Sequence, residues 1–141
     1  MPIEKVPDQP GLWREPGWKA QTPGVYALIV GVSRYPHLPD GGGAEAPDAF
    51  GLAQLGSSAS TAASLFEWLR GAFRHDGLPL VWCRLLLSPT AKEKKALDAA
   101  GITHYAEPTD ANLKFAIQSW TGAVPAKDPA ASDSRTLFFF S

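Results

Sequence analysis

Cys83 carries the only thiol in this chain of 141 residues, so it is the one cysteine that could act as a nucleophile. A reactive thiolate needs partial exposure and positive charge nearby. Cys83 instead lies between Trp82 and Arg84 inside an apolar run, where a thiol is usually a small buried hydrophobic group. In a regular strand Arg84 points to the opposite face. The sequence therefore predicts a structural role for Cys83.

The three histidines, His37, His75 and His104, are the remaining candidates for proton transfer or metal binding. None of them lies on a predicted helix with a carboxylate or a second histidine one turn away, so the sequence predicts no metal site. Each falls in a predicted connection between elements, and we expect all three at the surface.

Arg34 and Asp40 follow the first predicted strand, at Val25–Val30. Ligands of open parallel sheets bind outside the carboxyl ends of the strands, so Arg34 is the candidate substrate-binding residue. A solvated loop pair is the alternative. The nearby glycines 41–43 do not fit the spacing of a phosphate-binding loop, and a proline-rich loop follows them, which indicates flexibility instead.

The composition is typical of one globular domain, with 45% hydrophobic and 19% charged residues. The formal net charge of -1, without a basic block, argues against nucleic-acid and anionic-membrane partners.

The sequence has no apolar stretch of membrane-spanning length and no secretory signal. A lone cysteine fits a reducing compartment, so we expect a cytoplasmic protein, and no cofactor is predicted.

Apolar runs and apolar spacing predict the elements that position these residues. Strands are expected at 25–30, 80–87 and from Thr136, and both faces of the last strand need cover. The first helix is predicted from a stripe with spacings of three and four residues, formed by Leu55, Ala59, Ala62, Phe66, Leu69 and Phe73.

Two further helices are indicated by caps. Thr90 and Glu93 form a capping box, and Thr109 can cap a helix whose apolar side holds Leu113, Ile117, Trp120 and Val124. A linker is expected from Pro125 to Ser134. Strand, helix, strand, helix, strand predicts an α/β domain with a mainly parallel sheet, and three strands make that sheet incomplete.

Residues 1–24 are expected to form a separate proline-rich arm. Five prolines exclude a regular helix or a central strand there. Trp13 and Trp18 are expected to dock on the body of the domain, with a partner surface as the alternative.

The pieces from Val25 onward resemble, in their order, the N-terminal half of a caspase-like cysteine peptidase domain, the clan of caspases and metacaspases. The resemblance rests on YALIVGVSRY from Tyr26, on LLLSPT from Leu85, on the Pro108–Leu113 pattern before a helix, and on the final LFFFS. It implies a three-layer αβα fold for residues 25–141 and a cysteine endopeptidase that hydrolyses peptide bonds in protein substrates.

The family places its catalytic histidine just after the strand that Ser141 ends, and its catalytic cysteine after the following strand. The resemblance therefore implies that this chain alone is inactive and that a downstream segment or a second chain completes the sheet. Cys83 matches the second strand, so no catalytic role is carried onto it. Many metacaspase-like members carry Asn-Asp-Ala where this chain has Ser60, Thr61 and Ala62. That departure puts an acidic pocket for a basic P1 residue in doubt, and Arg34 could favour an acidic P1 residue instead.

Two other function classes stay open. One is a non-catalytic pseudo-peptidase module that docks on a partner protein through its arm and its incomplete sheet. The other is a flavodoxin-like or nucleotide-binding fragment, which nucleotides would stabilise against heat.

Overall fold

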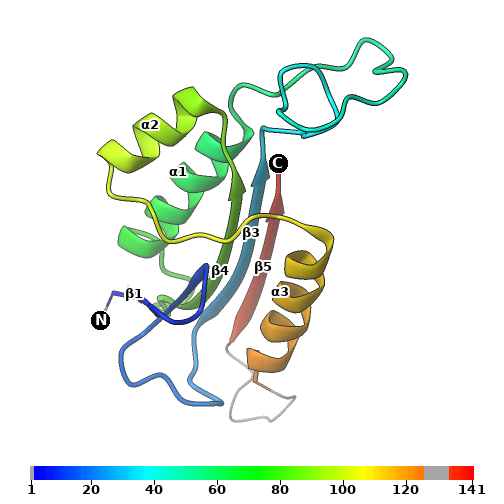
Figure 1. The fold of residues 1–141 in the computed structure, drawn as a ribbon. Coiled ribbons are helices and arrows are strands. Elements are labelled where there is room, and N and C mark those ends of the chain that lie inside the picture. The colour runs from blue at the N-terminus through cyan, green and yellow to red at the C-terminus, as the bar shows by residue number, and fades with distance from the viewer. Residues whose placement is uncertain (1, 126–133) are drawn as a thin grey trace.

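The computed structural model describes residues 2–125 and 134–141, and it is a mixed α/β structure with helices on both faces of one sheet (Figure 1). The helices are α1 (Ser58–Gly71), α2 (Ala91–Ala99) and α3 (Asp110–Ala123). The strands are β1 (Glu4–Lys5), β2 (Leu12–Arg14), β3 (Val25–Val32), β4 (Leu80–Ser88) and β5 (Arg135–Phe140). No helix in the described ranges is long and apolar enough to cross a bilayer.

The sheet has the order β1-β2-β4-β3-β5. Strand β3 lies between β4 and β5 and is parallel to both, which confirms the predicted parallel pairing of these three strands. Strand β2 is antiparallel to β4, and β1 is antiparallel to β2. The sheet is therefore mixed, with its parallel part built from the three predicted strands.

Strand β3 is buried on both faces because α1 covers one and α3 covers the other. Ala27 and Ile29 belong to the core on the α1 side, whereas Leu28 and Val30 pack on the α3 side. Gly31 lies where α1 comes closest. A Cβ atom there would be 2.6 Å from the Cβ of Ala62, so this contact requires glycine.

The stripe that predicted α1 is confirmed in the middle of the helix and wrong at its ends. The four central residues are buried: Ala59, Ala62, Phe66 and Leu69. Leu55 is exposed and precedes the helix, and Phe73 follows it. Ser57 makes no capping hydrogen bond through its side chain. The first turn is capped from elsewhere, since the amide of Ala59 donates to Ser33 Oγ at 2.9 Å.

The caps of α2 and α3 are both confirmed: Thr90 and Glu93 form the full capping box, and Thr109 accepts from the amide of Asn112. The predicted apolar side of α3 is wrong at Ile117, which is 45% exposed. Ala116 is the buried residue of this helix, because α3 turns Leu113, Ala116 and Trp120 toward the sheet.

The exclusion of a central strand from residues 1–24 is wrong. Strand β2 pairs with β1 on one side and β4 on the other, because the prolines at 10 and 16 flank Leu12–Arg14 without interrupting it. Gly11 reaches the required turn with φ +76°, and its carbonyl accepts from the amide of Leu85 at 2.8 Å.

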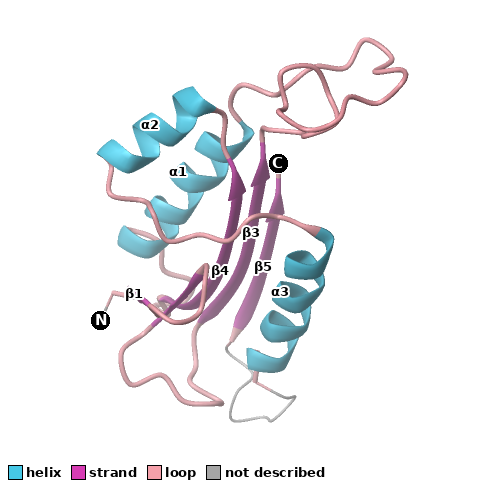
Figure 2. Ribbon diagram, viewed as in Figure 1, coloured by secondary structure: helices cyan, strands magenta, loops and turns pink. Residues whose placement is uncertain are grey.

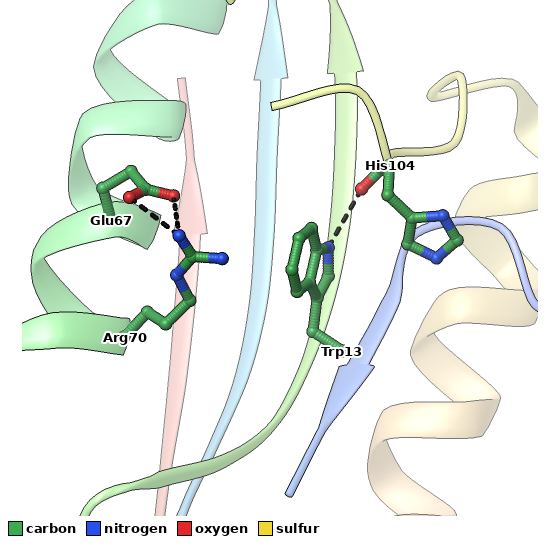
Figure 3. A network of polar contacts seen from close by, with 4 residues as sticks. All are labelled: Trp13, Glu67, Arg70 and His104. Atoms are coloured by element: carbon green, nitrogen blue, oxygen red, sulfur yellow. Dashed lines mark hydrogen bonds and ion pairs between the residues drawn. The ribbon is translucent and has the colours of Figure 1, made fainter. Parts of the chain in front are cut away.

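Trp13 of β2 is buried between the sheet, α1 and the connection after α2 (Figure 3). Its Nε1 donates to the carbonyl of His104 at 2.9 Å, and the Arg70 guanidinium lies 5.2 Å from the centre of its ring. The ring of His104 is half-buried, lies 5.6 Å from the Trp13 ring, and contacts the carbonyl of Gln9 through Nε2. His104 is therefore only partly at the surface, where all three histidines were expected.

Strand β5 is an edge strand of the sheet. Leu137 and Phe139 pack against the core on the α1 side, whereas Phe138 and Phe140 are 57% and 58% exposed. The cover expected on both faces of this strand is thus only partial within the described residues. The predicted linker from Pro125 to Ser134 lies outside the described residues except for its two ends.

Candidate functional site

Polar groups gather at the end of the sheet where the parallel strands β3, β4 and β5 terminate. The amides of Ser33 and Arg34, just after β3, both donate to the carbonyl of Ser88 at the end of β4, at 2.9 Å. The carbonyl of Ser141, just after β5, accepts from the amide of Val32 at 2.8 Å. The residues that follow the three parallel strands therefore meet at the same end of the sheet.

A pocket of about 340 Å³ opens beside this end of the sheet. Its walls come from the loop after β3 and from the start of α2, and they are formed by Arg34, Asp40, Gln54, Pro89, Thr90, Ala91 and Lys94. The structure thus brings Arg34 and Asp40 into one pocket. Lys94 adds a second cation, although it pairs with Asp98 at 2.9 Å.

Arg34 is exposed, and its side chain is held from one side only. Its Nε donates to the carbonyl of Gly41 at 2.8 Å. Within the described residues its two terminal nitrogens make no hydrogen bond. Because the terminal nitrogens of a guanidinium can bind both oxygens of a carboxylate, Arg34 is oriented and available for an anionic ligand.

Gln54 holds the long loop that carries Arg34, and sequence reasoning missed it. Its Oε1 accepts from the amide of Tyr35, and its Nε2 donates to the carbonyls of Tyr35 at 2.8 Å and Pro39 at 2.9 Å. Figure 2 shows this segment between β3 and α1 projecting from the body without regular structure. Gln54 and Tyr35 are 19 residues apart, so no local sequence pattern predicts their contact. The only signal was that Gln54 is a polar residue in a long loop.

Glu93 lies buried next to the pocket and joins the starts of two helices. Its carboxylate accepts from the amide of Thr90 within the capping box of α2, and from the amide and hydroxyl of Ser60 in α1, at 2.7 and 2.8 Å. Burial raises the pKa of Glu93, but hydrogen bonds from Ser33, Thr90 and Ser60 outweigh burial and leave the pKa below its ordinary value. Glu93 is therefore a charged structural group.

The remaining chemical candidates lie elsewhere. Cys83 is fully buried in the core on the α1 side, and burial raises the pKa of its thiol far above the ordinary value, which confirms the predicted structural role. His37 Nδ1 contacts the carbonyl of Ala44, and His75 pairs with Asp76. Across residues 2–125 and 134–141, no group of three or more potential ligands could hold a metal ion.

The outer side of β5 is a second feature of the same region. The amide and carbonyl of Ser141 both bond to β3. Because these groups alternate along a strand, those of Thr136, Phe138 and Phe140 point away from the sheet. No described strand pairs with that side. The outer side of β5 can therefore accept one more strand.

No protein-family model, curated protein or solved structure matches this chain.

Proposed function

We propose that residues 25–141 form the N-terminal half of a caspase-like cysteine endopeptidase domain that works in the cytoplasm on protein substrates. The observation that carries the proposal is the outer side of β5, which pairs with no strand among the described residues. A pocket with an available arginine lies at the carboxyl ends of the same parallel strands. A further strand on the outer side of β5 would extend the parallel sheet, and residues at its carboxyl end would lie at the same end of the sheet as Arg34.

The reaction that we propose needs a thiolate to attack a peptide carbonyl and a histidine to move protons. Cys83 cannot supply the thiolate because it is buried and its pKa is raised. In this proposal both catalytic groups come from a segment or a second chain that pairs with β5. In the same proposal, residues 25–141 contribute the substrate pocket.

Arg34 is the proposed substrate-binding residue. Its exposed guanidinium suits the carboxylate of an acidic P1 side chain, and Gly41 and Gln54 fix the loop around it. A charge-assisted hydrogen bond of this kind contributes about 1.5–3 kcal/mol, so we expect cleavage after Asp or Glu to be favoured over cleavage after Arg or Lys.

The test begins with the reading frame beyond codon 141 and with neighbouring genes. We expect a His-Gly pair shortly after Ser141 and a cysteine after the next strand, in the same chain or in a partner.

The completed protein would then be assayed on peptides with Asp or Arg at P1. We expect Arg34→Met to lower kcat/KM for the acidic peptide about 10- to 100-fold, with Arg74→Met, an exposed arginine outside the pocket, as the control.

A stop codon after Ser141 with no partner that supplies both residues would rule out catalysis. A completed protein that cleaves neither peptide would do the same.

The exposed Phe138 and Phe140 favour one second candidate, a non-catalytic module that binds a partner through β5. This candidate predicts a stable hetero-complex with the product of a neighbouring gene and no peptidase activity in that complex. Size-exclusion chromatography of the isolated chain tests whether either candidate needs a partner. A well-folded monomer would contradict both candidates, because each needs a segment or chain that pairs with β5.

A further inference from the structure

A second pocket, of about 410 Å³, lies on the α3 side of β4 and shares no residue with the pocket at the strand ends. Its floor is formed by Arg84 and Leu86 of β4, and one wall by Asn112, Phe115 and Ala116 of α3. Glu107, in the connection before α3, also lines it. Its volume is in the range of small-molecule sites.

Arg84 is an unusual residue for the middle of a strand, since it is charged and only 4% exposed. Its four hydrogen bonds all go to neutral acceptors. Nε and Nη2 reach Ser119 Oγ at 3.3 and 3.1 Å, Nη1 reaches the carbonyl of Pro10 at 3.1 Å, and Nη2 reaches Gln9 Oε1 at 3.1 Å. A guanidinium has five N–H donors, so one N–H of Nη1 is left over.

Neither charged side chain of this pocket has a counter-ion in the part of the chain that the structure describes. Within residues 2–125 and 134–141, Arg84 and Glu107 form no ion pair with each other or with any other side chain. A buried charge without a counter-ion is costly, and burial lowers the pKa of Arg84. The pocket therefore presents a buried cation and an exposed carboxylate, and neither has an ion-pair partner among the described residues.

The apolar part of the pocket lies close to the cation. The ring of Phe115 is centred 5.0 Å from the Arg84 guanidinium carbon, and the side chain of Phe115 is 58% exposed. An exposed phenylalanine over a buried arginine offers an apolar surface next to a charged group. Leu86 and Ala116 extend that surface into the pocket.

We propose that this pocket binds a small zwitterion of the amino-acid type with an apolar side chain. The carboxylate pairs with Arg84 through its remaining N–H, the ammonium group lies toward Glu107, and the apolar side chain covers Phe115 and Leu86. A ligand without a carboxylate leaves the buried charge of Arg84 without a counter-ion, and a ligand without an ammonium group makes no contact with the exposed Glu107. A phosphate ion is repelled by Glu107. This site is independent of the proposed peptidase function.

The test measures binding to the full chain by calorimetry and by thermal shift. The probes are L-phenylalanine, L-leucine, 3-phenylpropionate, which lacks the ammonium group, phenethylamine, which lacks the carboxylate, and inorganic phosphate. We expect saturable binding and a raised Tm with at least one of the two amino acids. We expect at least tenfold weaker binding of phenethylamine, because it leaves Arg84 without a counter-ion, and no binding of phosphate. Because Glu107 is exposed, 3-phenylpropionate should bind about two- to fivefold more weakly than L-phenylalanine. Equal binding of 3-phenylpropionate and L-phenylalanine, or no binding of either amino acid at 20 mM, would overturn the proposal.

Variants separate binding from folding. Arg84→Met should abolish binding, but it also removes the contacts to Pro10 and Gln9 that hold the arm.

Glu107→Gln changes an exposed side chain and should erase the preference for L-phenylalanine over 3-phenylpropionate. Phe115→Ala should weaken binding at least fivefold, whereas Ile117→Ala, on the same helix and outside the pocket, should not. An unchanged preference in Glu107→Gln, or equal losses in Phe115→Ala and Ile117→Ala, would contradict the assignment.

Discussion

At the scale of single residues, Glu93 shows how one side chain can have a local role and a distant one. Its capping box with Thr90 belongs to α2, whereas its second carboxylate oxygen binds the amide and hydroxyl of Ser60 in α1. Replacing the carboxylate leaves buried donors of both helices without a full acceptor. Glu93 should therefore matter more for stability than an ordinary cap.

We expect Glu93→Gln to lower the free energy of unfolding by about 1–3 kcal/mol at pH 7, measured by urea denaturation. Because the folded pKa lies below the ordinary value of 4.5, this stabilisation is present above pH 4.5 and is lost as the pH falls through the folded pKa. The two proteins should thus converge in stability in acid. Glu45→Gln, at an exposed loop residue, is the control, and a difference that persists unchanged below the folded pKa would contradict the role of the charge.

Cys83 gives a second prediction at this scale. Its thiol is buried and burial raises its pKa, so an aromatic disulfide reagent at pH 8 should modify it only when the chain unfolds. The modification rate in increasing urea should follow the unfolded fraction. Fast modification of the folded protein without urea would show that the thiol is accessible after all.

At the scale of elements, the contact between α1 and β3 depends on the absence of a side chain at Gly31. A Cβ atom there would lie 2.6 Å from the Cβ of Ala62 and 2.7 Å from the carbonyl oxygen of Ser58. The helix would have to move away from the strand that it covers, and overpacking of this kind typically costs 1–3 kcal/mol.

We therefore expect Gly31→Ala to lower the free energy of unfolding by about 1–3 kcal/mol in thermal or urea denaturation. Gly71→Ala, at the last residue of α1, is the matched control, because a Cβ atom there would meet nothing within 4 Å. That variant should be neutral or stabilising by up to about 1 kcal/mol. Equal effects of the two substitutions would mean that the helix–strand contact is not tight.

At the scale of the whole molecule, the arm is part of the sheet and of its core. Residues 12–14 pair with β4, Trp13 packs on Phe66 of α1 with ring centres 5.0 Å apart, and Arg84 holds the turn at Gln9 and Pro10. The arm thus joins β4, α1 and the connection after α2 (Figure 3).

Trp13→Ala should lower the free energy of unfolding by about 3–5 kcal/mol, because it empties a buried site and leaves the carbonyl of His104 without its donor. Trp68→Ala, at a mostly exposed tryptophan of α1, should cost less than about 1 kcal/mol. Chemical denaturation followed by circular dichroism compares the two. Similar small losses would indicate that the arm is dispensable for the fold.

The sequence by itself determined the features that depend on neighbouring residues. The uninterrupted apolar runs of β3 and β4 predict buried strands, the spacing of Thr90 and Glu93 predicts a capping box, and the apolar setting of Cys83 predicts an inert thiol. Each of these signals lies within one turn of a helix or a few residues of a strand, where propensity and periodicity act.

Only the tertiary structure decided which distant residues meet. It paired β2 with β4, placed Ser60 against Glu93, turned Ile117 outward, and joined Gln54 to Tyr35. It also showed that Arg84 is buried beside α3, with no counter-ion among the described residues. Such contacts depend on how the helices and the arm pack on the sheet, and packing geometry is set by the whole chain, so no local pattern encodes it.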